Sequence, residues 1–98
     1  MALDAGSAWK ACFCNWPAEL ARRGVLVTSF DEQIPFDGFL TSPDLLLVER
    51  RTPDTIGARQ VMLSYQAIVA IKITDVIKTQ AFEPLGFEDT GPPKKAHF

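Results

Sequence analysis

The sequence predicts a mainly β fold: a short N-terminal helix, then five short strands in a strongly bent antiparallel sheet that curls into a small barrel. Three observations support this fold class. Helix-capping residues enclose one segment near the N-terminus. After Gly24 the apolar residues recur with a period of two, as expected for strands. Residues 57–73 then contain two successive apolar strands without the glycine or asparagine of a hairpin turn between them.

The helix is expected over residues 15–24. Asn15 can cap its N-terminus, Pro17 suits a first turn because its missing N–H is not needed there, and Gly24 can end the helix in a left-handed conformation. Residues 8–14 are expected to form either an earlier turn of the same helix or a loose arm. The aromatic residues of this region indicate that it packs against another part of the chain.

The strands are expected at residues 25–30, 34–42, 45–51, 59–65 and 67–74. Gly38 lies within the second strand and indicates a sharp bend or a close backbone approach. Ser42-Pro43-Asp44 has the composition of a tight turn. Ser64-Tyr65-Gln66 is short and polar, so it suits a single turn of 3₁₀ helix between the last two strands.

The chain is expected to form one domain, because 98 residues can bury one modest core. We assign residues 1–15 to an N-terminal arm and residues 16–82 to the barrel with its leading helix. Residues 83–98 are polar and rich in proline and glycine, so they are expected to be a disordered tail. No apolar run reaches the roughly 20 residues that cross a bilayer, and no secretory signal is visible, so we expect a cytoplasmic protein that does not enter membranes.

The charge and the distribution of reactive residues exclude several function classes. The formal net charge is -2, whereas a protein that binds nucleic-acid duplexes without specificity carries a surplus of Lys and Arg. Catalysis is not expected, because the sole histidine, His97, lies in the tail and the carboxylates show no pairing pattern. Cys12 and Cys14 are too close for an unstrained disulfide and too few for a zinc site. We therefore expect reduced thiols, no metal and no cofactor.

The last two strands are expected to be paired along their edges. No charged residue occurs between Gln60 and Ile71, and such a stretch on a free sheet edge promotes aggregation. The pairing partner is either another strand of the same barrel or the matching edge of a second subunit. The candidate residues for an oligomer interface are the apolar residues of these strands: Val61, Leu63, Ile68, Val69 and Ile71.

Two short motifs resemble those of the Sm-like family, which includes the Hfq-type RNA chaperones. "GFLTSPD" (residues 38–44) is similar to the first family signature, with a glycine, an aliphatic residue and then an aspartate. "RQVMLSYQAIVAIKI" (residues 59–73) is similar to the second, with an apolar strand, a polar corner and another apolar strand. The resemblance covers residues 16–77. It implies an Sm-like, or SH3-like, barrel that forms homo-oligomeric rings, in which the fourth strand of one subunit pairs with the fifth strand of the next.

The resemblance also implies a set of candidate ligand-binding residues. Single-stranded RNA would be bound at the ring pore by Asp44, Ser64, Tyr65, Gln66 and Arg50. The chain differs from the family in this region, because the loop after Asp44 is short and the corner lacks the cation that would hold a phosphate. This difference favours a protein-interaction or scaffold module, with protein partners. Binding of short single-stranded RNA is the alternative.

Overall fold

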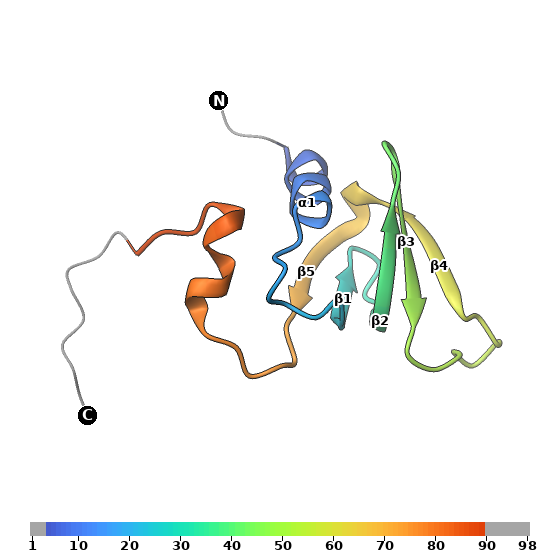
Figure 1. Cartoon of the computed structure of the whole chain (residues 1–98). Coiled ribbons are helices and arrows are strands. Elements are labelled where there is room, and N and C mark those ends of the chain that lie inside the picture. Colours follow the sequence, from blue (N-terminus) through green and yellow to red (C-terminus); the bar gives the residue numbers. More distant parts are fainter. Residues whose placement is uncertain (1–3, 90–98) are drawn as a thin grey trace.

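The computed structural model describes residues 4–89 as one helix, five strands and two short 3₁₀ helices (Figure 1). In chain order these elements are α1 (Ala5–Cys14), β1 (Gly24–Thr28), β2 (Gln33–Thr41), β3 (Leu45–Arg50), β4 (Gln60–Ser64), η1 (Tyr65–Ala67), β5 (Ile68–Lys72) and η2 (Thr79–Leu85). The predicted mainly β fold, with a short helix before five strands, is therefore confirmed. The predicted 3₁₀ turn between the last two strands is also present, as η1.

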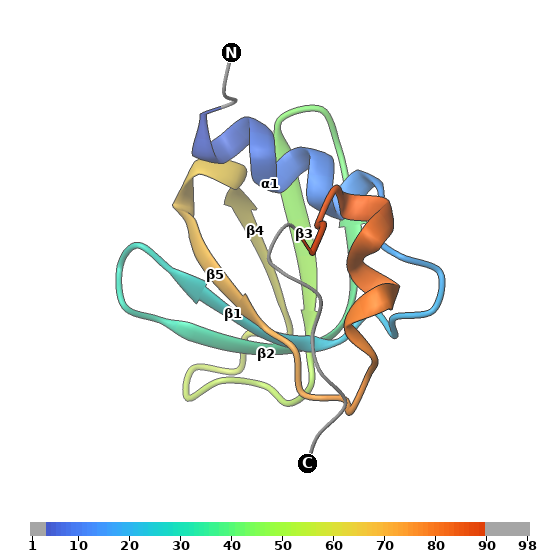
Figure 2. The same cartoon turned by 90° about the vertical axis from the view of Figure 1, so that its left-hand side faces the viewer.

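The five strands form one antiparallel sheet in the order β4-β3-β2-β1-β5. The sheet does not close into a barrel, which corrects the expectation from the sequence. β4 pairs only with β3 and β5 only with β1, and no ladder within residues 4–89 joins β4 to β5. Figure 2 shows how η1 carries the chain from one edge strand to the other across the end of the curved sheet. Within the described part of the chain, each edge therefore keeps a row of backbone groups without a strand partner.

The helix lies earlier in the chain than its predicted position at residues 15–24. The Asp4 side chain caps its N-terminus by accepting the Ser7 N–H at 2.7 Å, and Asn15 follows its last turn instead of preceding its first. Pro17 explains the difference, because proline disfavours the helical conformation of the residue before it. Residues 16–23 instead form turns. Within residues 4–89 no helix has the length and apolar character needed to cross a membrane.

Two glycines allow the sheet to bend sharply. Between Phe36 and Gly38 the register of β2 against β3 shifts, so the predicted bend at Gly38 is a bulge. At Gly24 an added Cβ would lie 2.5 Å from the Lys72 carbonyl oxygen on β5. This close backbone approach leaves no room for a side chain at the start of β1.

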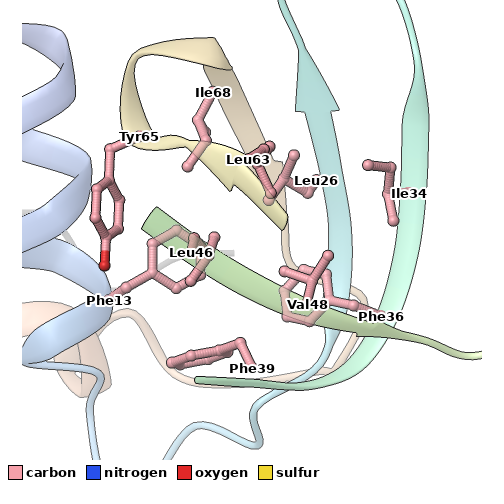
Figure 3. Packing of buried hydrophobic residues seen from close by; sticks show 10 residues of the cluster. All are labelled: Phe13, Leu26, Ile34, Phe36, Phe39, Leu46, Val48, Leu63, Tyr65 and Ile68. Carbon is pink, nitrogen blue, oxygen red and sulfur yellow. The ribbon is translucent and has the colours of Figure 1, made fainter. Parts of the chain in front are cut away.

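The core lies between the concave side of the sheet and α1 (Figure 3). Phe13 projects from α1, stacks on Trp16 at a centroid distance of 5.4 Å and meets the Phe39 ring edge-on at 4.8 Å. The segment expected to be an arm therefore packs directly on the sheet. The buried residues of this cluster are Phe13, Leu26, Ile34, Phe36, Phe39, Leu46, Val48, Leu63, Tyr65 and Ile68.

The C-terminal part of the described chain contains a 3₁₀ helix that the sequence did not predict. η2 ends at Leu85, and Gly86 follows with a φ of 96°, a left-handed conformation that suits glycine. Ala81 on η2 is buried. The first residues of the predicted disordered tail therefore lie in η2 and the turn that ends it, whereas residues 90–98 lie outside the described residues.

Candidate functional site

Four of the five candidate ligand-binding residues lie around one shallow pocket. This pocket, called the corner pocket below, has a volume of about 440 Å³ and lies where the β2–β3 loop, η1 and the start of α1 meet. Its lining residues are Asp4, Gly6, Ser7, Lys10, Pro43, Asp44, Ser64, Tyr65 and Gln66. The sequence motifs of the β2–β3 loop and of the β4–β5 corner are therefore adjacent in space.

Side-chain hydrogen bonds fix the two loops of the corner pocket. The Ser42 hydroxyl accepts the Leu45 N–H and donates to the Leu45 carbonyl, both at 2.9 Å, which closes the β2–β3 turn. The Ser64 hydroxyl accepts the Gln66 N–H at 3.1 Å at the start of η1. Serine often closes turns in this way, because its hydroxyl replaces a backbone partner.

Tyr65 connects the two loops from within the core. Its hydroxyl donates to the Ser42 carbonyl at 2.9 Å, and its side chain is only 4% exposed. Burial raises the pKa of the phenol above its usual value of 10.0. Because the ring packs in the core, its faces are not accessible for stacking on a base in this conformation. Figure 3 shows the hydroxyl at the edge of the apolar cluster, on the side that faces α1.

The buried phenol leads to a first prediction. Because the folded state raises the pKa of Tyr65, the neutral phenol stabilises the fold below pH 10, and this stabilisation is lost as the pH rises above that value. Tyr65 is the single tyrosine of the chain, so its ionisation can be followed by ultraviolet absorbance without overlap. Tyr65→Phe should lower the free energy of unfolding by about 1 kcal/mol, because the Ser42 carbonyl loses its donor. A phenol that titrates at its ordinary pKa in the folded protein would contradict this account.

The sequence analysis missed the contribution of α1 to the corner pocket. α1 packs closely on η1, since a Cβ added at Gly6 would lie 2.6 Å from the Gln66 Cγ. This contact brings Lys10 to the pocket, which supplies the cation that the corner itself lacks. The helix was predicted ten residues too late in the chain. Only its correct position would have identified Lys10 as a site residue.

The charges around the corner pocket do not form a basic site. Asp4 and Asp44 line it together with the single cation of Lys10. The backbone N–H of Ser7 lowers the pKa of Asp4, so this carboxylate stays ionised near neutral pH. The pocket therefore carries a slight negative charge, which opposes the approach of phosphates.

Arg50, the fifth candidate, lies away from the corner pocket. It ends β3, whereas Asp44 precedes the first residue of β3, and the length of a six-residue strand, about 17 Å, separates the two ends. The Arg50 Nε donates to the Thr52 carbonyl at 3.0 Å in the β3–β4 loop. The structure therefore does not bring Arg50 together with the other candidate residues.

The candidate interface residues fall into two groups. Leu63 and Ile68 are buried in the core of the monomer, with their side chains directed inward. Alternation along a strand explains the result, since every second side chain of an edge strand points inward. Val69 is 58% exposed, and Val61 and Ile71 are half-buried. The same alternation would have identified Met62, which the prediction omitted and which is 72% exposed.

The outer face of the sheet carries an apolar row that ends at the β4 edge. Leu40 on β2 is in register with Leu47 on β3, which is in register with Met62 on β4. Leu40 and Met62 are exposed, and Leu47 is half-buried. At the opposite edge of the sheet, Val69 is the exposed apolar side chain of β5. Both free edges therefore present apolar surface to solvent.

Carboxylates offset two of the arginines of the described surface. Arg23 forms an ion pair with Asp75 and Arg51 forms one with Asp37, each at 3.0 Å. Arg22 lies over the Phe39 ring, with its guanidinium carbon 4.6 Å from the ring centroid. Such exposed pairs contribute little to stability, but they remove the strongly basic surface that phosphate binding favours.

The described residues contain no group of three or more His, Cys, Asp or Glu side chains placed to hold a metal ion. Cys12 and Cys14 are free thiols, and burial raises the pKa of Cys12. No protein-family model, no curated protein and no solved structure matches this chain.

Proposed function

We propose that the protein is an Sm-like module that assembles head to tail, with the β4 edge of one copy paired with the β5 edge of the next, and that the assembly serves as a protein-interaction scaffold. The observation that carries this proposal is the pair of free sheet edges, each with an exposed apolar side chain, Met62 on β4 and Val69 on β5. Soluble proteins protect such edges with charges, prolines or covering segments.

The physical case for pairing with a second copy rests on the composition of both edges. No charged residue occurs from Gln60 to Ile71, so neither edge strand carries the lysines that discourage pairing, apart from Lys72 at the end of β5. Two different edges of one chain make a heterologous contact, which closes into a ring when the rotation between subunits permits it. Strand addition would satisfy backbone groups and place the side chains of a further strand beside the apolar row that ends at Met62.

The Sm-like assignment draws on three further features of the chain. The helix precedes the strands, the glycine of the first motif lies at a bulge in β2, and a single 3₁₀ turn separates β4 from β5. These features agree with the resemblance of residues 38–44 and 59–73 to the family signatures. Scaffolding is favoured over RNA binding because the corner pocket is slightly acidic and the ring of Tyr65 is buried.

A second candidate function is the binding of single-stranded RNA at the corner pocket. One observation favours it: Lys10 joins Ser64 and Gln66 there, so a cation and two hydrogen-bonding side chains converge at one place. A phosphate on Lys10 and a base edge on Gln66 would be the minimal contacts.

The two functions are separated by sedimentation and by titration with labelled oligo-U and oligo-A at low and physiological salt. The scaffold proposal predicts an oligomer at micromolar concentration that binds neither RNA. Salt-dependent binding of RNA that is lost in Lys10→Gln and retained in Lys78→Gln would contradict the scaffold proposal and support the RNA function. A monomer at micromolar concentration would remove the assembly on which the scaffold proposal rests.

A further inference from the structure

The helix α1 and the C-terminal segment enclose an apolar cleft that shares no lining residue with the corner pocket. Figures 1 and 2 both show η2 next to α1. The cleft, called the α1–η2 cleft below, consists of two adjoining hollows of about 310 Å³ and 150 Å³ that share four lining residues: Trp9, Cys12, Leu85 and Phe87. The other lining residues are Ala8, Ala11, Asn15, Trp16, Leu20, Ile71, Ile73, Phe82 and Pro84.

The wall formed by α1 and the following turn is firmly held. The Trp16 indole N–H donates to the Leu20 carbonyl at 3.0 Å, and the Trp16 ring stacks on Phe13. The same ring meets Phe39 edge-on at a centroid distance of 5.0 Å. Hydrogen bonding and packing on two sides therefore fix this aromatic surface before any ligand arrives.

The opposite wall packs against α1 and β5 through apolar side chains, among them Phe82, Leu85 and Phe87. The backbone hydrogen bonds recorded for residues 76–88, from Ala81 to Lys78 and from Gly86 to Glu83, both lie within that segment. Phe82 and Phe87 meet edge-on at 6.5 Å, again within the segment. The ion pair of Asp75 with Arg23 is the polar anchor that precedes it.

The lining of the cleft defines the chemistry of an occupant. No Asp, Glu, Lys, Arg or His lines either hollow, and four of the lining side chains are Trp or Phe. Asn15 supplies the one side-chain amide, at the wider hollow. Water in such a site finds few hydrogen-bond partners, so an apolar molecule displaces it at little cost. A charged group would lose its hydration without gaining a partner.

We propose that the α1–η2 cleft is a binding site for an uncharged aromatic small molecule, which is held between the indoles of Trp9 on α1 and Trp16 after it and the phenyl rings of the C-terminal segment. The volume of the wider hollow lies at the lower end of the range for small-molecule sites. Ile71 of the edge strand β5 lines the narrower hollow, but all lining residues belong to one chain, so the site does not require assembly.

The test uses two probes that share one aromatic skeleton. N-phenyl-1-naphthylamine is uncharged, and 1-anilinonaphthalene-8-sulfonate is the same molecule with one sulfonate. Trp9 and Trp16 are the two tryptophans of the chain and both line the cleft, so energy transfer from them reports a bound probe, which the variants below then locate. The uncharged probe should bind once per chain with a micromolar Kd and quench the tryptophan emission. The sulfonate should bind at least about tenfold more weakly.

A pair of matched variants locates the bound probe. Ala11 is an exposed residue of α1 that lines the wider hollow, so Ala11→Phe should fill the hollow and weaken binding of the uncharged probe at least about tenfold. Ala5 is also exposed on α1 but does not line the cleft, so Ala5→Phe should leave binding unchanged. Circular dichroism of both variants checks that the fold is kept.

Three outcomes would overturn the proposal. They are equal affinity for the two probes, unchanged binding in Ala11→Phe, and binding that appears only in the monomeric edge variant Met62→Lys. The last result would mean that a second copy covers the cleft in the assembly. Binding that is equal in the wild type and in Met62→Lys would support the proposal even if the protein proves to be a monomer.

Discussion

Phe13→Ala is expected to lower the free energy of unfolding by about 3–5 kcal/mol. Phe13 is almost fully buried and is the residue of α1 that contacts both Trp16 and Phe39. Its removal leaves a cavity at the junction of the helix and the sheet, which the ring of Phe39 cannot fill without leaving its own site. Urea unfolding followed by circular dichroism measures the loss.

A matched phenylalanine serves as the control for this prediction. Phe30 lies in the turn between β1 and β2 and is 59% exposed, so Phe30→Ala should change the stability by no more than about 0.5 kcal/mol. If Phe13→Ala leaves too little folded protein to measure, Phe13→Leu should show an intermediate loss. Equal effects of the substitutions at Phe13 and Phe30 would mean that α1 does not pack on the sheet as described.

Met62→Lys and Val69→Lys are each expected to convert the proposed assembly into monomers. Each substitution places a charge at the centre of one free edge, where pairing with a second copy would bury it without a partner. Both side chains are exposed in the monomer, so the fold should survive. Light scattering on the purified variants reports the mass directly.

The control for the edge variants is an exposed apolar residue away from both edges. Ile56 lies in the β3–β4 loop and is 89% exposed, so Ile56→Lys should retain the assembly. If all three lysine variants dissociate, added charge in general is responsible and the β4 and β5 edges are not the interface. If none dissociates, the copies contact one another elsewhere.

The strands were predictable from the sequence because alternation is a local signal. Each expected strand overlaps the observed one, and the polar residues at Ser64-Tyr65-Gln66 correctly predicted a 3₁₀ turn instead of a hairpin. The prediction treated the apolar run as one surface, whereas alternate residues of an edge strand face opposite sides, and the side chains of Leu63 and Ile68 lie in the core.

The position of α1 and the presence of Lys10 at the corner pocket were not predictable from local sequence signals. Asn15 and Pro17 have the composition of a helix start, yet the same residues also suit a helix end followed by turns, and packing of Phe13 decides between these alternatives. Lys10 reaches the corner pocket only because α1 rests on η1. The open sheet was not predictable either. Whether β4 and β5 pair depends on the path of the chain through η1, which strand propensity does not determine.

The most direct test of head-to-tail pairing mixes the two edge variants. Met62→Lys blocks β4 but keeps β5, and Val69→Lys blocks β5 but keeps β4, so each alone lacks one edge of the contact. In an equimolar mixture the intact β4 of one variant can pair with the intact β5 of the other, and the complex cannot grow further because both remaining edges are blocked. Native mass spectrometry should show monomers for each variant alone and a one-to-one heterodimer for the mixture. Monomers in the mixture, or homodimers of either variant alone, would contradict the pairing of β4 with β5.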